Sequence, residues 1–318
     1  MKISIPKISS QVYNQDIQHV LQKNYSVLGP IWTSHQLEWT NSIYASFRDH
    51  DKFLIVIYLI KKTLDFYARN FIKLSFSEFY SKDKVEIEKF NVIELSKNLN
   101  IPKESARRKI LELEQIDIIK KIKKKIIIDR SAFPFTKPTN SVKRVSRFLA
   151  MFSEILVKDK ILRKPLNSSI LEKVIENNFS YTWKMYYELQ IPMLLGYKKI
   201  FGEIENFHIF GSCVNNQHLN SQSLNKKPMN WTQFTEFMYS NNKILGMNAM
   251  SISDITGIPR STVVRKLKYL VKREMLKIDD KKYYKLTNIS VKKLMPVQNI
   301  VLHHLADFST KVYNLSIL

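Results

Sequence analysis

The sequence predicts a mainly α-helical fold with two winged helix-turn-helix domains, each a three-helix core plus a β-hairpin wing, joined and flanked by long helices. One observation behind this prediction is that residues 95–113 and 252–270 share a pattern of apolar, proline and basic positions. A second is that similar segments flank both copies in the same order, 76–79 with 234–237 upstream and 139–143 with 287–292 downstream. A shared order predicts a duplicated unit and an internal pseudo-twofold.

The repeat divides the 318-residue chain into four parts. Residues 1–50 show no counterpart, and we expect a helical extension packed on the first unit. The first winged-helix unit is 51–160, with its helix-turn-helix at about 91–115, its wing at 116–130 and a following helix at 140–158. Residues 161–230 are expected to form connecting helices and then a polar surface loop over 206–230. The second unit is 231–318, with its helix-turn-helix at about 249–272, its wing at 275–287 and a C-terminal helix at 296–315.

Charge is the strongest compositional signal, because 51 Lys and Arg stand against 28 Asp and Glu, for a formal net charge of +23. Such an excess indicates a polyanionic partner, and nucleic acid is the commonest one. A lysine-rich composition alone also raises net charge, so arginine position is the sharper test. Six of the eleven arginines fall in residues 91–131 and 249–288, about a quarter of the chain: Arg107, Arg108, Arg130, Arg260, Arg265 and Arg273.

The turn between the two helices of each copy carries residues suited to a sharp reversal. Gly257 tolerates the left-handed backbone region, and Asn100, one of the few tolerant non-glycine residues, occupies the same place in the first copy. Buried isoleucines and helix-starting prolines are expected to follow: Ile101 with Pro102, and Ile258 with Pro259.

The second helix of each copy has an apolar inner stripe and a polar outer face. The stripe recurs at i, i+4 and i+7, as Ala106, Ile110 and Leu113 in the first copy and Val263, Leu267 and Leu270 in the second. Arg, Lys, Ser and Thr can contact base edges or phosphates. The DNA-binding candidates are Lys103, Ser105, Arg107, Arg108 and Lys109, with Arg260, Ser261, Thr262, Arg265, Lys266 and Lys268. Glu104 would repel phosphates, so the second copy is expected to read DNA and the first chiefly to anchor it.

Each helix-turn-helix precedes a segment with the composition of a β-hairpin. In the first, residues 116–119 and 126–129 are expected to be the strands, and the lysine-rich stretch 120–125 the tip. In the second, residues 275–278 and 283–286 flank a turn at 279–282. Lysines at the tips would neutralise phosphates without reading sequence. The candidates are Lys121, Lys123, Lys124 and Lys125 in the first wing, and Lys281 and Lys282 in the second. Solvated turns are the alternative.

Residues 258–267, with the trailing residues 271–276, resemble the winged-helix domains of bacterial MarR-type and IclR-type transcriptional regulators. The resemblance covers about 40 residues in each copy. It implies that the two copies form a pseudo-dimer within one chain and present two winged helices to one operator. The duplication, the chain length and the N-terminal region depart from the pattern of those families.

Catalytic, metal and cofactor sites are not predicted. His208, Cys213 and His218 lie in one polar stretch, but their spacing matches no common zinc pattern. The six glycines form no phosphate-binding loop, and no nucleophile motif is present. The lone cysteine excludes a disulfide framework, and the longest apolar run, 53–60, is too short to span a membrane. The sequence therefore predicts a cytoplasmic, nucleoid-associated protein that is not an enzyme.

The sequence predicts binding of double-stranded DNA through two winged helices, and regulation of transcription. The two half-sites are expected to lie roughly 34–36 Å apart, one helical turn of DNA. Two alternatives stay open: a plasmid- or phage-type replication initiator with tandem winged helices, and a winged-helix scaffold that binds protein. Homodimer formation, a small-molecule effector and the operator sequence also stay open.

Overall fold

The computed structural model describes residues 11–87, 90–224 and 227–317. The first half of the chain begins with three helices, continues with short helices and a small sheet, and ends with a long helix. In order, its elements are α1 (Asn14–Lys23), α2 (Tyr25–Phe47), α3 (His50–Arg69), α4 (Phe76–Ser81), β1 (Lys84–Ile87), α5 (Val92–Leu99), α6 (Lys103–Gln115), β2 (Lys120–Ile122), β3 (Lys125–Asp129), a 3₁₀ turn (Arg130–Ala132), α7 (Phe133–Thr136) and α8 (Thr139–Lys158).

The second half has nearly the same order of elements. They are α9 (Ser168–Asn177), α10 (Phe179–Phe201), α11 (Ile204–Gln222), α12 (Trp231–Ser240), α13 (Ala249–Thr256), α14 (Arg260–Lys272), β4 (Leu276–Ile278), β5 (Tyr284–Leu286) and α15 (Asn288–Ile317). The mainly α-helical prediction, with two small antiparallel sheets, is confirmed. The C-terminal helix begins at Asn288 and not at residue 296, since Pro296 is accommodated within it.

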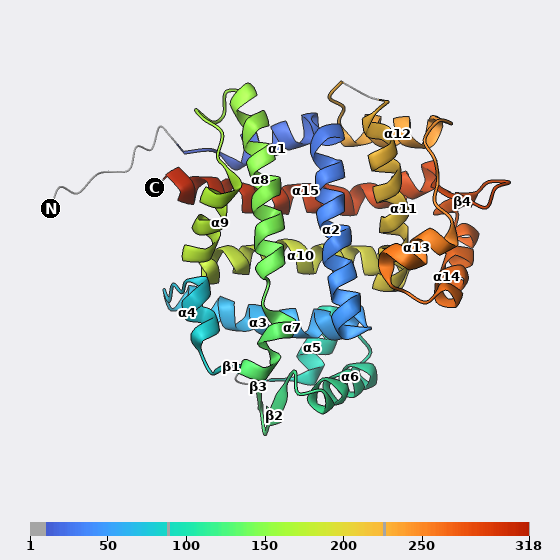
Figure 1. Ribbon diagram of the computed structural model, residues 1–318. Coiled ribbons are helices and arrows are strands. Elements are labelled where there is room, and N and C mark those ends of the chain that lie inside the picture. The colour runs from blue at the N-terminus through green and yellow to red at the C-terminus, as the bar shows by residue number, and fades with distance from the viewer. Residues whose placement is uncertain (1–10, 88–89, 225–226, 318) are drawn as a thin grey trace.

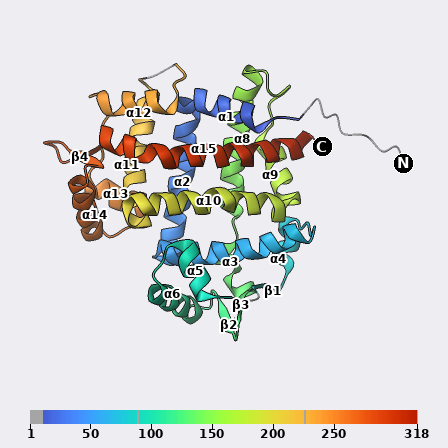
Figure 2. The ribbon, with the colours of Figure 1, turned by 180° about the vertical axis from the view of Figure 1, so that it is seen from behind.

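The long helices form two crossed layers. In Figure 1, α2, α8, α9 and α11 run top to bottom in front, and α1, α3, α10, α12 and α15 cross behind them. Figure 2 shows the crossing layer from its own side. Helices of one half pack on helices of the other: α1 on α15, α9 on α8, α2 on α11 and α10 on α3. The two halves are therefore interlocked.

The repeat includes the N-terminal region, for which the sequence shows no counterpart. Both α1 and α9 have 10 residues, both α2 and α10 have 23, and one asparagine joins each pair. These two asparagines, Asn24 and Asn178, each donate a side-chain hydrogen bond to the carbonyl four residues earlier, at Val20 and Val174. Residues 14–47 thus correspond to residues 168–201, and they pack largely on the second half of the chain. Residues 1–10 lie outside the described residues.

The expected polar loop over 206–230 is wrong for most of its length, because residues 204–222 form α11. Polar side chains do not prevent this helix, since Ser212 and Ser221 donate to carbonyls one turn back, at Ile209 and His218. The helix is buried between α2 and α10, so tertiary packing outweighs its polar composition. Within the described ranges, no helix is both long and apolar enough to cross a membrane.

Candidate nucleic-acid interface

Each half carries a compact unit of two short helices, a tight turn and a hairpin. We call α5, α6 and β1–β3 the first head, and α13, α14, β4 and β5 the second head. The turn residues Asn100 and Gly257 adopt left-handed backbone angles, with φ of 49° and 67°, as the sequence predicts. In both heads a serine of the first helix donates to the carbonyl of the following isoleucine, from Ser96 to Ile101 at 2.6 Å and from Ser253 to Ile258 at 2.7 Å.

The predicted inner stripes of both second helices are confirmed. Ala106, Ile110 and Leu113 are buried on α6, and Val263, Leu267 and Leu270 are buried on α14. The turn isoleucines Ile101 and Ile258 are buried as well. Burial of these apolar positions leaves the opposite face of each helix toward solvent.

The two hairpins differ from each other and, in the first head, from the prediction. The first hairpin pairs β2 with β3, so residues 116–119 are not a strand and the tip is only Lys123–Lys124. Ile118 and Ile119 are instead buried just after α6, where their amides bond back to the Leu113 carbonyl. The sequence also missed β1, which pairs with β3. The second hairpin matches the prediction, and Met247 forms a single bridge to Tyr284 where β1 would lie.

On α14 three of the four candidate cations face solvent and form no ion pair with the described residues. Arg260, Arg265 and Lys268 are exposed, as is Ser261, whereas Thr262 is half-buried. The helix contains no Asp or Glu between its first and last residues. Among the described residues, none of these three cations forms an ion pair. Lys272 is exposed too, and its spacing of four and seven residues from Lys268 and Arg265 could have identified it.

The equivalent face of α6 is largely neutralised by its own carboxylates. Lys103, Arg107 and Arg108 are exposed and Ser105 is half-buried. Arg107 pairs with Glu104 at 2.8 Å, and Arg108 approaches Glu112 at 3.6 Å. The positions of Glu104, Glu112 and Glu114 correspond to Ser261, Tyr269 and Val271 in α14. The two heads therefore present surfaces of different charge.

Two predicted contact residues, Lys109 and Lys266, turn inward instead. They occupy equivalent positions at the edge of the apolar stripe. Lys109 forms an ion pair with Asp49, which caps the start of α3. Lys266 is 5% exposed and pairs with Glu203, at the start of α11, and with Glu205 at 3.4 Å. Both lysines thus fasten a head to the helical layers and are unavailable to DNA.

The Lys109 contact also changes the acidity of its partner. Burial would raise the pKa of Asp49, but the hydrogen bond and charge of Lys109, with backbone amides at the helix start, lower it below the ordinary value of 3.8. Because the pKa of Asp49 is lower in the folded chain, the contact stabilises the fold at every pH above the ordinary pKa of 3.8. This contribution is lost as the pH falls through the lowered pKa.

Replacing Lys266 by alanine is expected to destabilise the protein by about 1 to 2 kcal/mol, because Glu205 is left poorly solvated and the buried lysine stem is lost. The effect is smaller than for a fully buried pair, since the Glu203 side chain is 62% exposed. Urea unfolding measures the change. Lys268→Ala, two residues away and exposed, is the control and should stay within about 0.5 kcal/mol of the parent. Equal losses in both variants would contradict the inward role of Lys266.

The first hairpin offers three lysines near its tip. Lys121, Lys123 and Lys124 are exposed and form no ion pair with the described residues. Lys125, also predicted to contact DNA, is exposed but lies 3.6 Å from Glu86 of β1. The tip of the second hairpin carries less net positive charge, because its exposed lysines, Lys281 and Lys282, follow Asp279 and Asp280.

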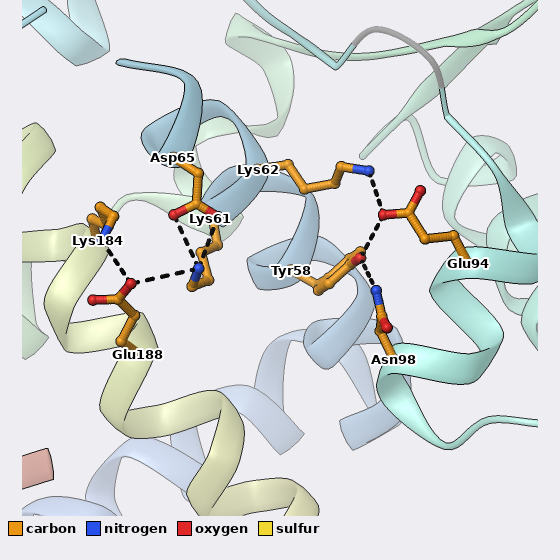
Figure 3. Close-up of polar contacts among 8 residues, drawn as sticks. All are labelled: Tyr58, Lys61, Lys62, Asp65, Glu94, Asn98, Lys184 and Glu188. Carbon is orange, nitrogen blue, oxygen red and sulfur yellow. Dashed lines mark hydrogen bonds and ion pairs between the residues drawn. The ribbon is translucent and has the colours of Figure 1, made fainter. Parts of the chain in front are cut away.

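A polar network holds α5 of the first head against the helical layers (Figure 3). Glu94 accepts from Lys62 at 2.8 Å and from the Tyr58 hydroxyl at 3.1 Å, while Asn98 donates to Tyr58 at 2.6 Å. The hydrogen bond from Lys62 lowers the pKa of Glu94 below its ordinary value. On the other side of α3, Lys61 and Lys184 both contact Glu188 of α10, at 3.8 and 2.6 Å. The first head is therefore fixed to α3, and α3 to α10.

The first head lies along the lower edge of the molecule in Figures 1 and 2, and the second lies along the right edge in Figure 1 and the left edge in Figure 2. Each is attached next to the start of a long helix, the first at α3 and the second at α11. Arg48, between α2 and α3, also donates to the Gly257 carbonyl in the turn of the second head, at 3.4 Å.

The three residues considered as metal ligands lie on one helix. His208, Cys213 and His218 are all buried on α11, and burial raises the pKa of the Cys213 thiol to about 12. In the part of the chain that the structure describes, no three His, Cys, Asp or Glu side chains gather as possible metal ligands.

Comparisons with models of protein families, with curated proteins and with solved structures give no match for this chain.

Proposed function

We propose that the protein binds double-stranded DNA through its two heads, each a winged helix-turn-helix domain, and thereby regulates transcription. The observation that carries this proposal is the outer face of α14, where Arg260, Arg265 and Lys268 are exposed with no acidic residue in the helix. A helix in the major groove needs such a face, because arginine forms paired hydrogen bonds to guanine and phosphates surround the groove.

The first head contributes mainly sequence-independent contacts. Its α6 face is partly neutralised by Glu104 and Glu112, whereas the exposed lysines Lys121, Lys123 and Lys124 sit on a projecting hairpin. A lysine hairpin suits phosphate contact, which adds affinity and not specificity. The bound site is therefore one well-defined half-site read by α14, beside a segment of relaxed sequence.

Selection of bound sequences from a random DNA pool tests the proposal, followed by affinity measurements over a range of salt concentrations. We expect one conserved half-site and a plot of log K against log salt with a slope of about −4.5 to −5.4, corresponding to five or six phosphates at about −0.9 each. Two equally conserved half-sites would contradict the division of roles between the heads. Absence of salt-dependent binding to any duplex would overturn the proposed function itself.

A further inference from the structure

A cavity of about 90 Å³ lies where the helical layers meet the second head. Residues of α2, α10, α11, α12, β5 and α15 line it. Its walls are largely aromatic and include Tyr25, Trp32, Tyr197, Phe207 and Trp231. None of the lining residues is Asp, Glu, Lys or Arg, and burial lowers the pKa of the lining His218 to about 3, so the ring is neutral.

Polar groups in this wall lack partners. Both amide atoms of Gln36 are buried without a hydrogen-bond partner in the described structure, and so is Nδ1 of His218. Gln36 is 7% exposed and His218 is 1% exposed. Buried polar groups in native proteins are almost always satisfied, so these groups indicate an occupant of the cavity. The equivalent glutamine of α10, Gln190, is likewise buried without a hydrogen-bond partner among the described residues.

The duplication supplies an internal comparison, because helices α2 and α3 match α10 and α11 with a constant shift. Three small or polar residues of the cavity wall, Gly211, His218 and Thr40, correspond to Ile57 and Leu64 of α3 and to Leu194 of α10. All three of these aliphatic residues are buried to 1% exposure or less. Side chains thus fill the inner space between α3 and α10, whereas the equivalent space between α11 and α2 stays open.

Gly211 marks this difference most clearly. It lies within α11, where glycine is unfavourable relative to alanine, and a Cβ atom added there would meet nothing within 4 Å. Gly211 is half-buried, as are the lining residues Phe207 and Val214, so this part of the wall borders the surface and gives a route of entry.

We propose that this cavity binds a small, neutral, planar molecule whose adjacent hydrogen-bond donor and acceptor pair with the amide of Gln36. An apolar cavity of about 150 Å³ accommodates benzene, so a single ring requires this cavity of about 90 Å³ to widen by at least about two thirds. Met193 and Met238 line the cavity and can supply this widening, because methionine side chains change rotamer easily. A charged ligand is excluded, since no cation or anion in the wall would compensate its loss of hydration.

Calorimetric titration of the full chain with benzamide tests this inference, with benzoate at neutral pH as the charged comparison. Benzamide is expected to bind and benzoate is not. Gly211→Ile, which copies the first half, should weaken benzamide binding at least tenfold while leaving the thermal midpoint unchanged or higher. Gln36→Leu should also weaken binding at least tenfold, and it does not depend on whether Gly211→Ile folds. Leu219→Ala, exposed on the same helix, is the control that should bind as the parent does.

Failure of benzamide to bind the parent chain would overturn the inference and leave ordered water as the occupant of the cavity. Equal binding by the parent, Gly211→Ile and Gln36→Leu would overturn it as well, because benzamide would then bind elsewhere. The measurement involves no DNA, so neither outcome affects the proposed function of the heads.

Discussion

Arg265→Ala is expected to lower affinity for the selected DNA site about 10- to 100-fold, whereas Arg108→Ala at the equivalent position of α6 should change it by less than about threefold. The two residues occupy the same place on their helices and are both exposed. They differ in their surroundings, and this makes them a matched pair for assigning roles to the two heads.

The expected difference follows from charge. Arg265 lies on a helix without acidic residues, so its guanidinium can donate two hydrogen bonds to a guanine edge and lose hydration without breaking an ion pair. Arg108 lies 3.6 Å from the Glu112 carboxylate, which also pairs with Lys52 at 2.7 Å. Contact between Arg108 and DNA would bring Glu112 toward the phosphates, and the repulsion offsets the gain.

Competition against unrelated duplexes distinguishes sequence-specific contacts from sequence-independent contacts. Arg265→Ala should lose affinity mainly for the selected site, and a combined change of Lys121, Lys123 and Lys124 to alanine should weaken all duplexes alike and reduce the salt slope. If Arg108→Ala lost as much specific affinity as Arg265→Ala, the two heads would read DNA equally.

The parts of the heads that the sequence predicted correctly depend on local patterns. The left-handed turn at Asn100 and Gly257 and the buried stripes of α6 and α14 follow from residue type and helical spacing alone. The direction of Lys109 and Lys266 does not, because each lies at the edge of a stripe and its partner, Asp49 or Glu203, is about 60 residues away in the chain. Charge at a helix surface therefore predicts a ligand contact only when no distant acid competes for it.

Two features of the fold were not predicted because they depend on tertiary packing. The polar composition of residues 206–222 resembles a loop, and only burial between α2 and α10 shows why it is helical. The correspondence of residues 14–47 with residues 168–201 was missed because the two segments share few residues. The clearest match is at the junction of the two helices, where Asn24 and Tyr25 correspond to Asn178 and Phe179. Packing constrains the length and joint of such helices more than their exact side chains.

Acidification from pH 7 to pH 5 is expected to destabilise the protein by roughly 5 kcal/mol or more, which is comparable to the whole stability of many domains. Four buried histidines cause this: His35, His50, His208 and His218. Burial lowers the pKa of His35 and of His218 to about 3 and that of His50 to about 4, and it lowers the pKa of His208 well below the ordinary 6.5.

The sign follows from proton uptake. Well above pH 6.5 the four rings are neutral in both folded and unfolded chains, so they add no pH dependence there. Below pH 6.5 the unfolded chain binds protons that the folded chain cannot, and the free energy of unfolding falls by up to about 1.4 kcal/mol per histidine for each pH unit. The loss continues until the pH reaches the folded pKa values. Two of the rings, His50 and His208, face each other at 3.1 Å, so a charge on His50 opposes protonation of His208.

Urea unfolding at pH 7, 6 and 5 measures this dependence, and His218→Leu isolates one of the four contributions. Leucine occupies the equivalent position in the first half, at Leu64, so this variant is expected to fold. It should retain about 2 kcal/mol more of its stability between pH 7 and pH 5 than the parent does. His303→Asn, at an exposed histidine of α15, should follow the parent curve. A parent whose stability stays constant from pH 7 to pH 5 would show that these rings are hydrated or charged in the folded protein, and the packing of α2 against α11 would need revision.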